Sequence, residues 1–231
     1  MTDYIRPITT VDPVIFTLKD NELHILLIKR KEEPYAGWLS LPGGWVYADQ
    51  DQNLDESVER VLKEKTGVTQ AYFEQLHTFG SMKRDPRQWS ISIAYVSLMG
   101  WDKVEKAAAG RGAQELVWLP VKDINLTELA FDHAEIINMS LERLRNKVNY
   151  STLPVHLLPE KFTKTQLQQV YETVLEANID KSAFRKKLNE LDFLEETGER
   201  HAGLTNRPPM LYRLKKDFLN QCFRSNLKNF K

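Results

Sequence analysis

Residues 41–68 read LPGGWVYADQDQNLDESVERVLKEKTGV, and this stretch decides the fold of the N-terminal part of the chain. A Pro-Gly-Gly turn opens it at Pro42. Apolar residues then recur at the spacing of a helix that buries one face, at Leu54, Val58, Val61 and Leu62. The pattern predicts a loop followed by a helix from Asn53 to Thr66.

The same stretch resembles the Nudix pattern Gly-x5-Glu-x7-Arg-Glu-aliphatic-x-Glu-Glu-x-Gly-aliphatic. The glycines, Arg60, Leu62, Glu64 and Gly67 fall where that pattern requires them. The carboxylate positions of the pattern are changed. After a two-residue insertion near residues 49–51, they fall on Gln52, Val61 and Lys65.

These replacements bear directly on chemistry. Val61, Glu64 and Lys65 are spaced i, i+3 and i+4, so a helix places them on one face. Carboxylates there would bind divalent cations such as Mg²⁺, which would polarise a diphosphate and activate water. An ammonium group repels such a cation. We therefore expect a pocket that binds a nucleoside-diphosphate-type ligand but does not hydrolyse it. The protein is then not an enzyme, and we expect no catalytic residues, metal ligands or cofactor.

The composition is that of a globular protein. The chain has 231 residues, 42% of them hydrophobic, and five tryptophans. Its longest aliphatic run, Ile25 to Ile28, is too short to span a bilayer, and the first six residues do not resemble a signal peptide. Cys222 is the only cysteine, so no internal disulfide can form. These features predict a cytoplasmic protein without a membrane segment.

The zero net charge hides an asymmetry between the two parts of the chain. Residues 1–150 hold 18 Lys and Arg against 22 Asp and Glu, whereas residues 151–231 hold 14 against 10. Such opposite signs are compatible with chance, but they also suggest that the C-terminal part meets a polyanion.

The hydrophobic periodicity predicts an α+β chain with a sandwich at 1–150, and the resemblance to the Nudix pattern implies that it is a Nudix α/β/α sandwich. The order of elements at 151–231 predicts a winged helix-turn-helix domain. Alternating or β-branched segments predict strands at 11–18, 23–30, 72–79, 91–98 and 115–119. A helix is expected at 132–147. Pro154 and Pro159 mark the linker between the two domains.

The C-terminal segment shows two helices and then a hairpin. Thr163 and Gln166 form a capping-box signature before the first helix, and Asp180 is a good N-cap for the second. Strands are expected at 193–195 and 211–214, joined by a polar loop. This order is typical of a winged helix-turn-helix. A small helical domain with a solvated basic face is the alternative. The residues that we expect to contact DNA are Lys164, Lys181, Ser182, Arg185, Lys186, Arg200 and Arg207.

Candidate ligand-binding residues lie in the Nudix-like stretch and in separate segments on either side of it. Arginines pair bidentately with phosphates, which favours binding over a surface Arg–Asp turn at residues 84–87. Asp132 is also a candidate helix cap, and Arg60 a candidate anchor between loop and helix. Trp38 and Trp45 would either stack on an adenine or lie in the core. The residues that we expect to bind the effector are Arg30, Gly43, Gly44, Arg60, Glu64, Arg84, Asp85, Arg87, Asp132 and His133.

Taken together, the chain resembles the Nudix-related transcriptional regulators of the NrtR family. The resemblance rests on Leu41–Trp45, Glu64–Gly67, Arg84–Arg87, Leu129–His133 and Asp180–Leu188. It implies a homodimeric repressor of NAD-metabolism genes that binds a palindromic DNA operator and senses ADP-ribose. Alternatives are a sugar-responsive regulator of the same type, a weak Nudix pyrophosphatase, and a module whose basic domain docks an acidic protein.

Overall fold

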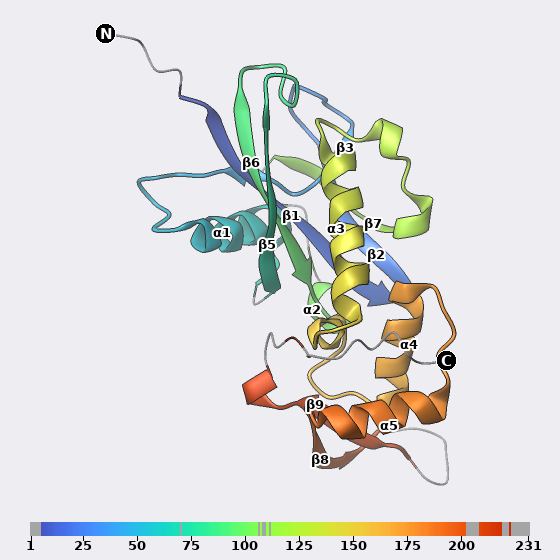
Figure 1. The fold of residues 1–231 in the computed structure, drawn as a ribbon. Coiled ribbons are helices and arrows are strands. Elements are labelled where there is room, and N and C mark those ends of the chain that lie inside the picture. The colour runs from blue at the N-terminus through green and yellow to red at the C-terminus, as the bar shows by residue number, and fades with distance from the viewer. Residues whose placement is uncertain are drawn as a thin grey trace. The chain divides into compact units, whose positions relative to one another are not determined.

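The computed structural model describes residues 6–69, 71–105, 107, 110, 112–201, 208–218 and 222. These residues form two compact units (Figure 1). The first unit consists of Met1–Phe16, His24–Leu98 and Val104–Leu141. The second consists of Thr17–Leu23, Met99–Lys103 and Glu142–Lys231.

The first unit is built on a mixed seven-stranded sheet. Its strands are β1 (Ile8–Lys19), β2 (Glu22–Arg30), β3 (Leu39–Ser40), β4 (Gly44–Trp45), β5 (Tyr72–Ser81), β6 (Ser90–Leu98) and β7 (Ala113–Pro120). The main order is β3-β2-β1-β6-β5, with β4 paired to β1 and β7 paired to β2. β1 runs parallel to β6, and β4 is antiparallel to β1. The short β4 therefore brings the Pro-Gly-Gly loop against the centre of the sheet.

Two helices cover opposite faces of this sheet (Figure 1). α1 (Leu54–Thr66) begins at Asn53, whose side chain accepts a hydrogen bond from the backbone of Glu56. Its buried Val58, Val61 and Leu62 pack on apolar residues of β1, β2 and β6. α3 (His133–Val148) buries Ile136 and Ile137 on the other face. The predicted α/β/α sandwich is thus confirmed.

The shorter elements of the chain are helical turns. They comprise α2 (Trp101–Val104) and the 3₁₀ segments η1 (Val121–Asp123), η2 (Leu126–Glu128), η3 (Leu153–Leu157) and η4 (Lys216–Phe218). The sequence pattern predicted none of these short elements, nor the two-residue strands β3 and β4. None of the helices among the described residues is long and apolar enough to cross a membrane.

The second unit contains the predicted helix pair and hairpin. α4 (Lys164–Leu175) starts at the predicted capping box, and α5 (Lys181–Leu191) starts at the predicted N-cap Asp180. Between them, Tyr171 packs edge-on against Phe184 with ring centroids 5.3 Å apart. β8 (Leu194–Arg200) then pairs antiparallel with β9 (Met210–Leu214). The winged helix-turn-helix prediction is confirmed.

Candidate functional site

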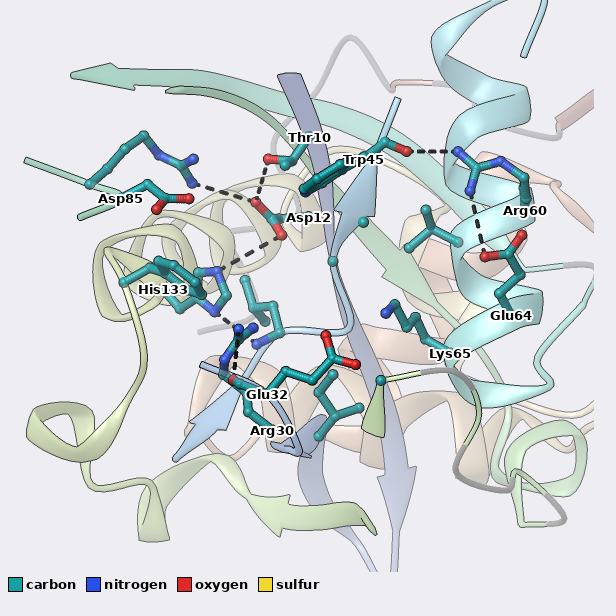
Figure 2. Close-up of a pocket in the computed structure, with 18 of the residues that line it drawn as sticks. Thr10, Asp12, Arg30, Glu32, Trp45, Arg60, Glu64, Lys65, Asp85 and His133 are labelled. Carbon is teal, nitrogen blue, oxygen red and sulfur yellow. Dashed lines mark hydrogen bonds and ion pairs between the residues drawn. The ribbon is translucent and has the colours of Figure 1, made fainter. Parts of the chain in front are cut away.

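A cavity of about 280 Å³ opens in the first unit, at the edge formed by β1, the Pro-Gly-Gly loop and α1 (Figure 2). It gathers nine of the ten predicted effector residues: Arg30, Gly43, Gly44, Arg60, Glu64, Arg84, Asp85, Arg87 and His133. These residues come from five separate stretches of the sequence. Asp132, the tenth, does not line the cavity but supports it, as described below.

The floor of the cavity is a buried polar network centred on Asp12, which the sequence reading missed. Asp12 is only 5% exposed and accepts hydrogen bonds from the hydroxyls of Ser92 and Thr10. Arg84 Nη2 lies 3.5 Å from the Asp12 carboxylate. A buried carboxylate requires such partners, because leaving its charge unpaired away from water is costly. The signal in the sequence was an aspartate inside an otherwise apolar strand.

Arg84 is held in place by carboxylates on two sides. Its Nε and Nη2 donate to Asp132 at 2.9 and 3.0 Å, and its Nη1 donates to Ser90 at 3.1 Å. The Asp132 carboxylate thus pairs with Arg84. The alternative role of Asp132 as a helix cap did not include this contact. Arg84 is 6% exposed, so its guanidinium stiffens the cavity floor. Its direct contact with a ligand stays a prediction.

His133 joins this network to the Pro-Gly-Gly loop. Its Nδ1 accepts a hydrogen bond from the Leu41 backbone N–H at 2.9 Å, so the neutral ring carries its hydrogen on Nε2. Nε2 lies 3.8 Å from Asp12 Oδ1. Burial lowers the pKa of His133, although the nearby Asp12 opposes this effect. A neutral imidazole therefore fixes the start of the loop above the network.

The two glycines of the loop leave no room for side chains. A Cβ on Gly43 would lie 1.7 Å from Asp12 Oδ1, and one on Gly44 would lie 2.7 Å from a methyl group of Val61. The loop is therefore pressed between the Asp12 network and α1. This close approach, and not a special backbone angle, explains why glycine stands at both positions.

Arg60 anchors the loop to α1. It donates to both Asp51 oxygens at 2.7 Å. It also donates to the carbonyl of Trp45 at 2.7 Å and lies 3.6 Å from Glu64 (Figure 2). These hydrogen bonds, above all those from Arg60, hold the pKa of Asp51 well below its usual range. Asp51 faces α1, where it also accepts a hydrogen bond from the hydroxyl of Ser57. Gln52 is exposed.

Two arginines that line the cavity lie near the same aromatic ring. The guanidinium carbons of Arg30 and Arg87 lie 4.8 and 5.9 Å from the ring centre of Phe131. Burial lowers the pKa of Arg30, and the positive charge of Arg87 lowers it further. Arg87 also pairs with Asp85, at 2.6 Å. Like charges held this close favour an anion between or beside them.

The tryptophans of the loop region are exposed. Trp45, which lines the cavity, is 49% exposed, and Trp38 is 43% exposed. The alternative that they are core residues was wrong. Trp45 lies in β4, where it pairs with Thr10 of β1. An exposed indole at the mouth of a polar cavity is suited to stacking on a flat ring.

The predicted DNA-binding residues lie mostly on the exposed side of α5. Lys181, Ser182, Arg185 and Lys186 are all exposed, while Phe184 and Leu188 on the opposite side are buried. The helix therefore presents one basic, polar face to solvent.

The remaining predicted DNA contacts lie outside α5. Lys164, at the start of α4, donates to Asn189 at 2.9 Å and sits 4.6 Å from the ring centre of Tyr212. Arg200 is exposed at the end of β8 and donates to the carbonyl of Pro208 at 2.9 Å. Arg207 lies outside the described residues.

The fold and the cavity define a class of protein, a Nudix-type ligand-binding unit in one chain with a winged helix. Comparisons with known protein families support this class for both the N-terminal and the C-terminal part of the chain. The NUDIX domain matches residues 9–139, and the NrtR DNA-binding winged helix domain matches residues 154–214. The chain belongs to the NrtR family of Nudix-related regulators.

Individual relatives support this assignment. The chain is 39% identical over 213 residues to the ADPR responsive transcriptional repressor NtrR of Acinetobacter baylyi, covering 92% of this chain and 84% of that protein. The structure matches Shewanella oneidensis NrtR complexed with a 27mer DNA with a TM-score of 0.85 and 37% identity, over 95% of this chain and 99% of that one.

Two further matches concern the Nudix part alone. The Nudix domain of the same Shewanella protein, complexed with ADP-ribose, matches with a TM-score of 0.57 and 37% identity, over 61% of this chain and 90% of that one. The ADP-ribose pyrophosphatase of Methanocaldococcus jannaschii is 38% identical over 135 residues, which is 58% of this chain and 73% of that protein. The Nudix part is therefore similar both to a regulator and to an enzyme.

Proposed function

We propose that this protein is a homodimeric transcriptional repressor of NAD-metabolism genes that binds a palindromic operator and responds to ADP-ribose. The observation that carries the proposal is the pairing, in one chain, of an arginine-lined cavity with an exposed basic helix of a winged helix domain. The 39% identity to an ADPR-responsive repressor over nearly the whole chain supports it.

In this proposal ADP-ribose occupies the cavity of the first unit. Arg30 and Arg87, brought together at the ring of Phe131, pair with the diphosphate. Trp45, exposed at the mouth, stacks on the adenine ring. Arg84, Asp132 and His133 act from the floor, by fixing the loop and the shape of the cavity.

DNA contacts are assigned to the second unit. Arg185, Lys186 and Ser182 on α5 read or flank bases in the major groove. Lys181, Arg200 and Arg207 contact phosphates or the minor groove, and Lys164 supports the face through Asn189. The proposal takes residues 1–150 as the effector domain and 151–231 as the DNA-binding domain.

Repression then depends on the spacing of two recognition helices. A two-fold dimer reads a palindrome only when its helices lie about one turn of DNA apart, or a multiple of that distance. A ligand that binds one arrangement of the dimer more tightly shifts the population toward it. ADP-ribose releases the operator if the arrangement it favours breaks this spacing.

The test is a fluorescence-anisotropy titration of DNA from upstream of the protein's own operon, with and without ADP-ribose. Tight binding that ADP-ribose reverses is the expected result. Tight binding that is indifferent to ADP-ribose would overturn the effector assignment. Equal binding to the operator and to a scrambled duplex would overturn the repressor assignment.

Hydrolysis of ADP-ribose is the second candidate function, favoured by the similarity to the Methanocaldococcus pyrophosphatase. We propose that turnover is negligible, because Val61 and Lys65 stand at carboxylate positions of α1 and Glu64 lies beside Arg60. Incubation with ADP-ribose and Mg²⁺, followed by chromatography for AMP, tests this. AMP release within minutes at low enzyme concentration would instead make the protein an enzyme.

A further inference from the structure

The face of α1 that borders the cavity lacks the donors that a divalent cation requires. Val61 is 1% exposed, and its methyl groups pack against Gly44. Asp51 is occupied by Arg60, Ser57 and the Tyr47 backbone N–H. Among the described residues there is no group of three or more His, Cys, Asp or Glu side chains that could hold a metal ion. The donor set does not fit Mg²⁺, which is bound through several oxygens at strict geometry.

The charge of the cavity also differs from that of a cavity with carboxylates at these positions of α1. Five lining residues are Arg or Lys and four are Asp or Glu. With glutamates at positions 61 and 65 the same cavity would hold four cationic and six anionic side chains. Such a cavity would repel a diphosphate unless metal ions neutralised it first. The cavity as it stands attracts an anion without that help.

Lys65 is the residue that makes most of this difference. It lies in the last turn of α1, half-buried, and lines the cavity. Its Nζ would be 2.9 Å from a Cβ on Gly112, so the ammonium lies against a backbone that carries no side chain there. Figure 2 shows the Lys65 side chain reaching from α1 toward the interior of the cavity.

We propose that the Lys65 ammonium takes the place of the divalent cation, as a built-in counter-charge for the ligand's diphosphate, so that effector binding is independent of Mg²⁺. This inference rests on the proposed function, in which the cavity binds ADP-ribose. Arg30 and Arg87, which both lie near the ring of Phe131, line the same cavity, so the diphosphate would have cationic groups from separate segments of the chain.

A lysine ammonium in place of a metal ion would bind the ligand without activating water. An ammonium neutralises a phosphate oxygen and donates hydrogen bonds to it. It does not generate hydroxide from water at neutral pH, as a bound metal ion does. The same residue would therefore contribute to affinity and leave the ligand intact, and a sensor requires both.

The experiment measures ADP-ribose affinity of the full-length protein by isothermal titration calorimetry, once in EDTA and once in excess Mg²⁺. The wild type should bind with the same Kd, within about twofold, in both buffers. Lys65→Met keeps the aliphatic stem but removes the charge, and should bind roughly 10- to 100-fold more weakly in both. Lys65→Arg should recover most of the affinity.

Lys63→Ala is the matched control, since Lys63 is exposed on the same helix and does not line this cavity. It should bind like the wild type. A Val61→Glu/Lys65→Glu variant should bind only when Mg²⁺ is present. Thermal unfolding of each variant identifies any loss of affinity that comes from misfolding.

Two results would overturn the inference while leaving the proposed function standing. One is wild-type binding that requires Mg²⁺, and the other is Lys65→Met binding as tightly as the wild type. Absence of ADP-ribose binding by the wild type in both buffers would instead overturn the proposed effector, and this inference with it.

Discussion

The proposed ligand cavity and the proposed DNA-binding face, which is the exposed side of α5, are built in opposite ways. In the cavity, charges are buried and joined to one another: Asp12 meets Arg84, which also meets Asp132. On α5, Arg185 and Lys186 are exposed above an apolar helix face. Charges that pair with one another hold the binding groups of the cavity in one arrangement before a ligand arrives. Exposed basic side chains adapt to a phosphate backbone and keep their charge available to it.

Removing Arg84 should have the largest effect, because it tests whether the buried charges of the cavity stabilise the fold. Arg84→Ala would leave Asp12 and Asp132 without their shared partner inside the protein. We expect a loss of about 3–5 kcal/mol in the free energy of unfolding, because a buried charge is left uncompensated. Urea unfolding measures it.

Arg87→Ala is the control for that experiment. The Arg87 side chain is 39% exposed, and the hydrogen bond from the backbone N–H of residue 87 to the buried Asp85 survives the substitution. Its loss should therefore change stability less than the loss of Arg84, while still weakening ADP-ribose binding. Equal stability losses for the two variants would contradict the distinction drawn between floor and wall of the cavity.

The DNA-binding face should respond in affinity and not in stability. Arg185→Ala should weaken operator binding by about 1–3 kcal/mol and relax the preference for one base pair, with unfolding unchanged. Anisotropy titrations against single-base operator variants measure both effects. Lys187, whose Nζ lies 3.6 Å from Glu190, offers a control on the same helix. A uniform loss across all sequences would exclude base reading by Arg185.

His133 provides a pH test of the cavity. Its folded-state pKa is lowered by burial, so below the ordinary histidine value of about 6.5 the unfolded chain binds a proton that the folded chain resists. Stability is therefore full above that pH and falls as the pH decreases toward the folded-state value. The slope should be at most about 1.4 kcal/mol per pH unit.

His133→Gln keeps an acceptor for the Leu41 N–H but does not titrate. Urea unfolding between pH 7 and pH 5 should show a shallower slope in this variant than in the wild type. An identical slope in both would mean that other groups dominate the acid response.

The smallest expected effect is at the wing. Arg200 is exposed and donates only to the carbonyl of Pro208 among its described contacts. Arg200→Ala should weaken binding to operator and scrambled DNA alike, and should reduce the slope of log affinity against log salt by about 1. A change in sequence preference at constant salt slope would assign Arg200 to base reading instead.

The sequence predicted the regular elements well because their signals are local. The stripe of α1, the capping box at Thr163 and the N-cap at Asp180 each depend on residues within one or two turns. Motif resemblance also located most of the cavity wall. What it missed were partners distant in the sequence, such as Asp12 with His133. No periodicity reports a pairing across 121 residues, and only the misplaced charge in β1 hinted at it.

Other errors have similarly physical causes. The pairing of Asp51 with Arg60 was not predicted, because loop spacing does not fix which side chain faces the helix. Exposure of Trp38 and Trp45 could not be read from composition, since large apolar residues are buried more often than not.

One measurement tests the central claim most directly. The operator complex of the full-length protein is titrated with ADP-ribose in EDTA, and the ligand is recovered afterwards and analysed by chromatography. The account predicts that DNA is released and that the ADP-ribose is recovered intact. DNA that stays bound at saturating ADP-ribose, or release accompanied by AMP, would contradict it.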